Sequence, residues 1–268
     1  MLPLAGSGFP ADHEALKTAL EAGLKKHGIA HKSLRVEGDT YPQIEKLELD
    51  LSGAEVTRET RLPVAKSEVR HALTVANLKL TAKTLRLEKT PARLEIKATG
   101  AHFDFGHDSK KHSALILTGA DKGDLLVQVQ RADLEELLRT VATEAAAGHG
   151  VEVKSTRLEL TTATPRILTF RAEVKAKMFV MSATVTVSGE AEVDDQLNAR
   201  LSKLTCSGDG MVGSVASGFI KPYFAKVENR PISLMALPLG TLKLRDISIA
   251  GGEALTLKAS FQSEPLVA

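Results

Sequence analysis

Apolar and charged residues alternate along most of this chain with a period of two. Leu47, Leu49 and Leu51 are separated by Glu48 and Asp50, for example. Comparable runs are Leu78-Lys-Leu80, Leu85-Arg-Leu87, Leu94-Glu-Ile96-Lys, Val151-Glu-Val153-Lys, Leu158-Glu-Leu160, Val185-Thr-Val187 and Leu255-Thr-Leu257. This alternation predicts strands with one dry face and one wet face, as in antiparallel sheets. About fourteen such runs are too many for one flat sheet, so we expect the sheet to curl, split or close.

Three segments have helical spacing instead. The first covers residues 12–27, with Asp12 as its N-cap. The second covers residues 133–147, opens with the acidic Asp133-Leu-Glu-Glu136, a relative of the capping box, and ends at Gly148. The third covers residues 209–227 and contains Pro222, which should kink it. Each helix has an apolar stripe that needs a partner surface, and the dry faces of the strands can supply one.

These patterns predict an α+β, strand-rich protein in which a long, highly curved antiparallel sheet wraps around amphipathic helices. We expect a single elongated domain over residues 1–268. A strand, a Thr-Pro turn and a second amphipathic strand follow one another in 84–98 and again in 156–176. Two interpretations remain open: a duplication with related halves at 30–125 and 150–262, or generic amphipathic hairpins that look alike.

Composition narrows the function classes. The chain has eight Phe, two Tyr and no Trp, so it offers few stacking platforms for bases or sugars. Its net charge is +2 and the charges are interspersed, which argues against nucleic-acid binding. Cys206 is the only cysteine, which excludes an intrachain disulfide and a cysteine-based zinc site. No stretch is apolar enough for a transmembrane helix, and the N-terminus has no secretory signal as written.

One glycine motif and one histidine-rich stretch are candidates for chemistry. Gly208-Asp-Gly210-Met-Val-Gly213 matches a dinucleotide-binding turn, with Glu228 as the acid for the ribose. The preceding segment alternates like a half-exposed strand, however, which favours a flexible turn capped by Asp209. The His/Asp-dense stretch contains His102, Asp104, His107, Asp108 and His112. His102 and Asp104 would share a strand face, but no firm third metal ligand can be named, so a solvated polar turn is favoured.

The case for an enzyme is weak. Asp104-Phe-Gly106 spells a kinase triplet, yet the other kinase motifs do not precede it. No nucleophile elbow or Ser/His/Asp set is evident, and Cys206 reads as a small half-buried apolar side chain. We therefore expect no catalytic residues, no metal and no cofactor.

The apolar stripes of the three helices remain. Each of these residues taken alone is best explained as part of a hydrophobic core. Long curled sheets that enclose helices, however, tend to leave an elongated cavity lined by aliphatic side chains, which suits an apolar ligand. The predicted groove lining consists of Leu16, Leu20, Leu24, Leu134, Leu137, Leu138, Val141, Val212, Val215, Ala216, Phe219, Ile220 and Phe224.

The last sixty residues contain a strand at 201–210, an amphipathic helix after it, a Leu237-Pro-Leu-Gly240 turn and a hairpin that begins at Gly251-Gly252. In this order of features they resemble the LmeA-like group of bacterial phospholipid-binding cell-envelope proteins. This resemblance implies a tubular lipid-binding (TULIP-like) fold, with a curved sheet around a long helix, and phospholipid binding without turnover. The chain departs from this group because no signal or anchor segment is visible.

The functional prediction is therefore non-catalytic binding, with transfer as an extension, of phospholipid or another long-chain apolar ligand. The alternative is a structural or protein-interaction module of the cell envelope with a filled core and no ligand. The expected partner is a lipid or fatty-acyl ligand, with transient contact to a membrane surface and no nucleic acid. The predicted location is the periplasm or cell envelope if a signal segment has been removed, and the cytoplasm if the sequence is complete.

Overall fold

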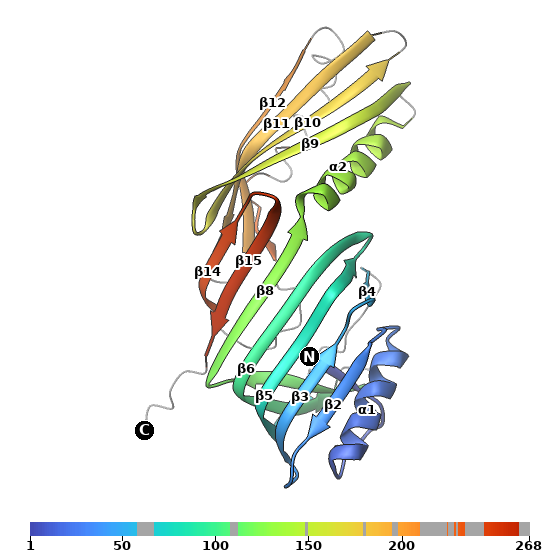
Figure 1. Ribbon diagram of the computed structural model, residues 1–268, viewed down its shortest axis with the longest axis vertical. Coiled ribbons are helices and arrows are strands. Elements are labelled where there is room, and N and C mark those ends of the chain that lie inside the picture. Colours follow the sequence, from blue (N-terminus) through green and yellow to red (C-terminus); the bar gives the residue numbers. More distant parts are fainter. Residues whose placement is uncertain are drawn as a thin grey trace. The chain divides into compact units, whose positions relative to one another are not determined.

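The computed structural model of the chain is dominated by long strands, with two helices in the part that it describes (Figure 1). The described residues are 1–57, 67–107, 112–147, 150–178, 181–194, 198–209, 224, 228, 230–233 and 244–262. The predicted α+β, strand-rich class is confirmed. A sheet wrapped around the helices stays a prediction.

The chain divides into two compact units. Unit 1 contains Met1–Val127, Met235–Asp246 and Lys258–Ala268, and unit 2 contains Gln128–Leu234 and Ile247–Leu257. Each unit therefore combines one long continuous segment with residues from the C-terminal part of the chain.

The larger sheet has the strand order β14-β15-β8-β6-β5-β3-β2, and β1, β4 and β7 pair at its sides. Its strands are β1 (Leu2–Leu4), β2 (Ser33–Glu37), β3 (Gln43–Asp50), β4 (Glu55–Val56), β5 (Ser67–Leu87), β6 (Thr90–His107), β7 (Ser113–Gly119), β8 (Lys122–Gln130), β14 (Leu244–Ala250) and β15 (Ala254–Phe261). The alternation of apolar and charged residues in the sequence matches the burial of the side chains in this sheet. Leu47 and Leu49 are buried, for example, whereas Glu48 between them faces outward. The long β5–β6 hairpin shows the same pattern on β6.

This sheet is mixed rather than wholly antiparallel. Most of its pairs are antiparallel, but β3 and β4 each pair with β5 in parallel. Parallel neighbours need a crossover connection instead of a tight turn. The chain between β3 and β5 spans residues 51–66, which is long enough for such a crossover.

Helix α1 (His13–Lys26) belongs to the core of unit 1. Asp12 caps it as predicted, because its Oδ1 accepts a hydrogen bond of 2.8 Å from Ala15 N. The helix contacts β1 and β2, and Ala5 N donates to Ala19 O at 2.8 Å (Figure 1). Strand β1 pairs in turn with β7, so α1 packs against a strand that belongs to the sheet.

Unit 2 contains a second, antiparallel sheet in the order β13-β12-β11-β10-β9. Its strands are β9 (Val151–Thr164), β10 (Ile167–Met178), β11 (Met181–Val193), β12 (Asn198–Gly208) and β13 (Ile232–Ser233). The β9–β10 hairpin and the β5–β6 hairpin are the two segments that look alike in sequence, and one lies in each unit. Whether they arose by duplication stays a prediction.

Helix α2 (Arg131–Ala146) lies along β9 in unit 2. Thr156 Oγ1 donates to Glu135 O at 2.8 Å, and Leu158 N donates to Glu135 Oε1 at 2.8 Å. The predicted capping role of Asp133 is wrong, because the helix begins two residues earlier, after Gln130. A backbone N–H of the first turn is bonded instead to a residue outside the helix, because Arg131 N donates to Glu253 O at 2.9 Å.

Tyr41 ties the segment before α1 to unit 1. Its hydroxyl donates to Pro10 O at 2.7 Å, and its ring stacks on Phe9 with 5.8 Å between centroids. Burial of the phenol is the larger cause, and the negative charge of Asp12 the smaller one, of a rise in the pKa of Tyr41 to about 12.

Alkaline titration should therefore destabilise the fold. The folded chain favours the protonated phenol, so this contribution to stability is complete below pH 10 and is lost as the pH rises from 10 towards 12. Ultraviolet difference absorbance should show a late-ionising tyrosine that disappears in Tyr41→Phe and in urea. A single ordinary titration in the folded wild-type protein would contradict this assignment.

Candidate functional site

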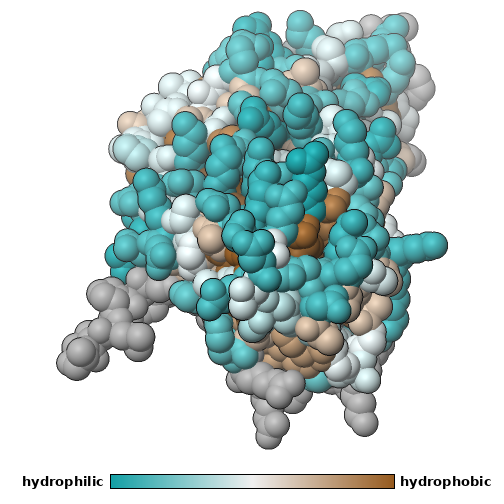
Figure 2. Space-filling model, turned by 60° about the horizontal axis from the view of Figure 1, so that its bottom comes forward, coloured by the Kyte–Doolittle hydropathy of each residue, from teal (hydrophilic) through white to brown (hydrophobic). Residues whose placement is uncertain are grey.

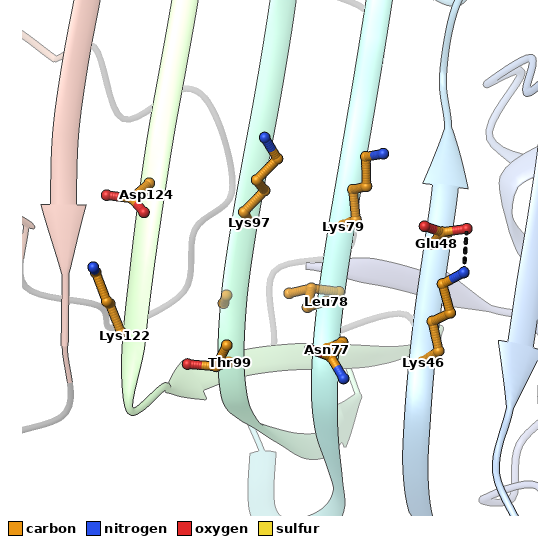
Figure 3. A pocket seen from close by; sticks show the side chains of 10 residues that line it. Lys46, Glu48, Asn77, Leu78, Lys79, Lys97, Thr99, Lys122 and Asp124 are labelled. Atoms are coloured by element: carbon orange, nitrogen blue, oxygen red, sulfur yellow. Dashed lines mark ion pairs between the residues drawn. The ribbon is translucent and has the colours of Figure 1, made fainter.

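A hollow opens on the polar face of the larger sheet in unit 1. Its volume is about 400 Å³. We call it the lysine hollow, and its lining consists of Lys46, Glu48, Asn77, Leu78, Lys79, Lys97, Ala98, Thr99, Lys122 and Asp124. The side chains come from β3, β5, β6 and β8, and Figure 3 shows them side by side across these strands.

Strand register brings these side chains together in two rows. In the first row Asn77 lies opposite Lys46 on one side and Thr99 on the other. In the second row Lys79 lies between Glu48 and Lys97 in the same way. Figure 3 shows Lys122 continuing the first row and Asp124 the second. The hollow is thus a surface with four lysines on four neighbouring strands.

Two of the four lysines have carboxylate partners. Lys46 Nζ lies 3.2 Å from Glu48 Oε2, and Lys97 forms an ion pair with Glu95, just outside the hollow. The Lys97 hydrogen bond, with a further contribution from Arg93, lowers the pKa of Glu95. Within the described part of the chain, Lys79 and Lys122 have no ion-pair partner.

The predicted apolar residues of α1 lie in the core. Leu16, Leu20 and Leu24 are 0%, 1% and 2% exposed, and none of them lines the lysine hollow. They pack where α1 meets β1 and β2. Their assignment to a groove stays a prediction.

The corresponding stripe of α2 is far more accessible. Leu137 is 41% exposed and Val141 53%, while Leu134 and Leu138 are half-buried. No residue of α2 is fully buried. The apolar stripes of the two helices are similar in sequence, but only the stripe of α1 is buried.

The third predicted stripe falls largely outside the described residues, which applies to Val212, Val215, Ala216, Phe219 and Ile220. Phe224 is described as a half-buried helical residue.

The glycine motif shows no dinucleotide geometry in its described part. Gly208 ends β12 and Asp209 follows it, while the remainder of the motif lies outside the described residues. Glu228 instead accepts a hydrogen bond of 3.2 Å from Leu204 N on β12. Cys206 is half-buried on the same strand, opposite Val187.

The His/Asp stretch lies at the end of β6. His102 and Asp104 are there joined by His71 of β5, with 3.8 Å between His71 Nδ1 and Asp104 Oδ1. His107 contacts Ser7 O, His112 lies against His27, and Asp108 lies outside the described residues. In the described ranges, no three His, Cys, Asp or Glu side chains are arranged to hold a metal ion.

The lysine hollow was not predicted from the sequence. Its lysines occupy wet positions of alternating strands, as do many other charged residues of the chain. Only the register of strands that are distant in sequence singles them out. Hydrophilic side chains also cover most of the face seen in Figure 2, with hydrophobic surface in small patches between them.

Neither described helix is both long enough and apolar enough to cross a membrane. No protein-family model matches the chain, and no curated protein or solved structure is significantly similar to it.

Proposed function

We propose that the protein binds phospholipid or another long-chain amphiphile without catalysis, with the acyl part held on the apolar side of unit 2. The observation that carries this proposal is the contrast between the two helices. The stripe of α1 is sealed in the core, whereas Leu137 and Val141 of α2 remain accessible. An accessible aliphatic stripe beside a sheet is the kind of surface that a TULIP-like fold would offer to lipid.

The burial pattern of unit 2 supports the same proposal. Its buried apolar side chains, among the described residues, are few and mostly small: Leu168, Ala172, Ala176, Ala183, Val185, Val193, Ile247 and Ile249. The apolar positions of β9, including Leu158 and Leu160, are only half-buried. Each methylene of an acyl chain that such a surface removes from water contributes about 0.8 kcal/mol. A chain of about twelve carbons could therefore bind without a specific polar contact.

A second candidate is a structural or protein-interaction module with a filled core. The core of unit 1 favours it, because Leu47, Leu73, Phe103 and Leu115 are at most 1% exposed. Native mass spectrometry and organic extraction of the purified protein distinguish the two. We expect co-purified lipid; a ligand-free spectrum together with no uptake of a fluorescent fatty acid would favour the module.

The exposed stripe gives a variant that should keep its fold. Leu137→Asp combined with Val141→Asp should lower fatty-acid affinity about tenfold or more, because full burial of one such side chain contributes about 1.5–3 kcal/mol. Thr143→Asp, exposed on the other side of α2, is the matched control. Circular dichroism should report folded protein for both. Equal affinities for the two variants would exclude this stripe as the binding surface.

A further inference from the structure

The lysine hollow carries more positive charge than its own carboxylates neutralise. Four lysines and two carboxylates line it, which leaves an excess of two positive charges. Glu48 forms an ion pair with Lys46 at 3.2 Å, so it does not neutralise Lys79 as well. Asp124 lies at the β8 edge of the hollow (Figure 3). Lys79 on β5 and Lys122 on β8 are therefore the lysines of the hollow that no ion pair in the described residues neutralises.

The register also places two lysines on neighbouring positions of β5 and β6. Lys79 of β5 lies directly opposite Lys97 of β6. Side chains in such positions have Cβ atoms about 4.5–5.5 Å apart, and like charges there destabilise the pair. Glu95 offsets the charge of Lys97 only. A bound anion would remove the repulsion by contacting both lysines.

The floor of the hollow supplies a neutral hydrogen-bond donor. Thr99 and Asn77 lie opposite each other in the row next to Lys79 and Lys97. The Asn77 amide already donates to Glu45 O at 3.3 Å, whereas the Thr99 hydroxyl points towards β8 (Figure 3). Leu78 and Ala98, which also pair, are buried beneath them and close the bottom. The hollow thus combines point charges, a neutral donor and a closed base.

We propose that the lysine hollow binds a phosphate group, carried by a free ligand or by a lipid headgroup. A phosphate monoester has about −1.5 to −2 charges at pH 7, and Lys79 and Lys122 are the two lysines of the hollow that no ion pair among the described residues engages. Lysine ammonium groups bind phosphate as point charges, and the Thr99 hydroxyl can donate to a remaining oxygen. The site lies wholly in unit 1, so it does not depend on the apolar surface proposed in unit 2.

Titration calorimetry with inorganic phosphate and with glycerol 3-phosphate, at an ionic strength matched with chloride, tests a free ligand. Flotation with phosphatidylcholine vesicles, with and without phosphatidic acid, tests a headgroup. We expect saturable binding to at least one phosphate probe. Lys79→Gln combined with Lys122→Gln should weaken it about tenfold or more, because two charge-assisted contacts are removed.

Lys154→Gln combined with Lys175→Gln is the matched control, since it removes the same charge from exposed positions of β9 and β10. Binding of free phosphate that only the hollow variant weakens assigns a soluble ligand. Binding confined to phosphatidic acid vesicles, with the same pattern, assigns a headgroup. No saturable binding to any probe, or equal weakening in both double variants, would overturn the proposal. Fatty-acid uptake should be unchanged in either double variant, so failure here is distinct from failure of the proposed lipid binding.

Discussion

Leu20→Ala should lower the free energy of unfolding by about 2–5 kcal/mol. Leu20 is 1% exposed in α1 and lies in the core of unit 1 with Leu16 and Leu24. Truncation removes buried methyl groups and leaves a cavity that the surrounding strands can close only in part. Urea unfolding followed by circular dichroism measures the loss.

The control for this change is Leu137→Ala on α2. Leu137 is 41% exposed, so its replacement should change stability by no more than about 0.5 kcal/mol. The opposite result would be informative: if Leu20→Ala unfolds like the wild type but takes up less fatty acid, α1 lines a groove rather than a core. The pair of variants therefore tests both the core assignment and the predicted lining.

Local signals in the sequence were sufficient for the strands and for the first helix. Alternation identified the β3, β5 and β6 strands, and the apolar spacing after Asp12 gave 12–27 for a helix observed at His13–Lys26. These features depend on neighbours a few residues away. The sequence therefore carries them directly.

The start of α2 shows where local signals fail. The acidic residues Asp133–Glu136 resemble a cap, but the helix begins at Arg131, whose backbone N–H is bonded to Glu253 O. The partner lies more than a hundred residues away in sequence. A tertiary contact thus overrides the local preference, and no local pattern could reveal it.

The register between strands was equally hidden. The parallel pairing of β3 with β5 and the position of Lys79 opposite Lys97 both depend on register. Alternation fixes which face a side chain occupies, but not which residue of another strand lies beside it. The candidate anion site follows from register, so it emerged only with the structure. The different burial of the two helical stripes depends on the tertiary packing of each helix, which the spacing of its apolar residues does not encode.

Gly23→Ala should destabilise unit 1 although alanine is the better helix former. Gly23 lies in α1 where the helix meets β1. A Cβ at this position would lie 2.6 Å from Pro3 C and 2.9 Å from Leu4 Cα, and closer still to Pro3 O. These neighbours are backbone atoms of a paired strand, so they cannot rotate away as a side chain would. The clash therefore has to be relieved by separating α1 from β1.

Helix propensity alone would favour Gly23→Ala by about 1 kcal/mol. Overpacking in a core costs about 1–3 kcal/mol, and a backbone neighbour places this site at the upper end. We therefore expect a net loss of stability of about 1–2 kcal/mol, measured by urea unfolding. Gly8→Ala is the control, because a Cβ there meets nothing within 4 Å. A stabilised Gly23→Ala protein would mean that β1 does not pack against α1 as closely as described, and the sealed stripe of α1 would then have to be reconsidered as an accessible one.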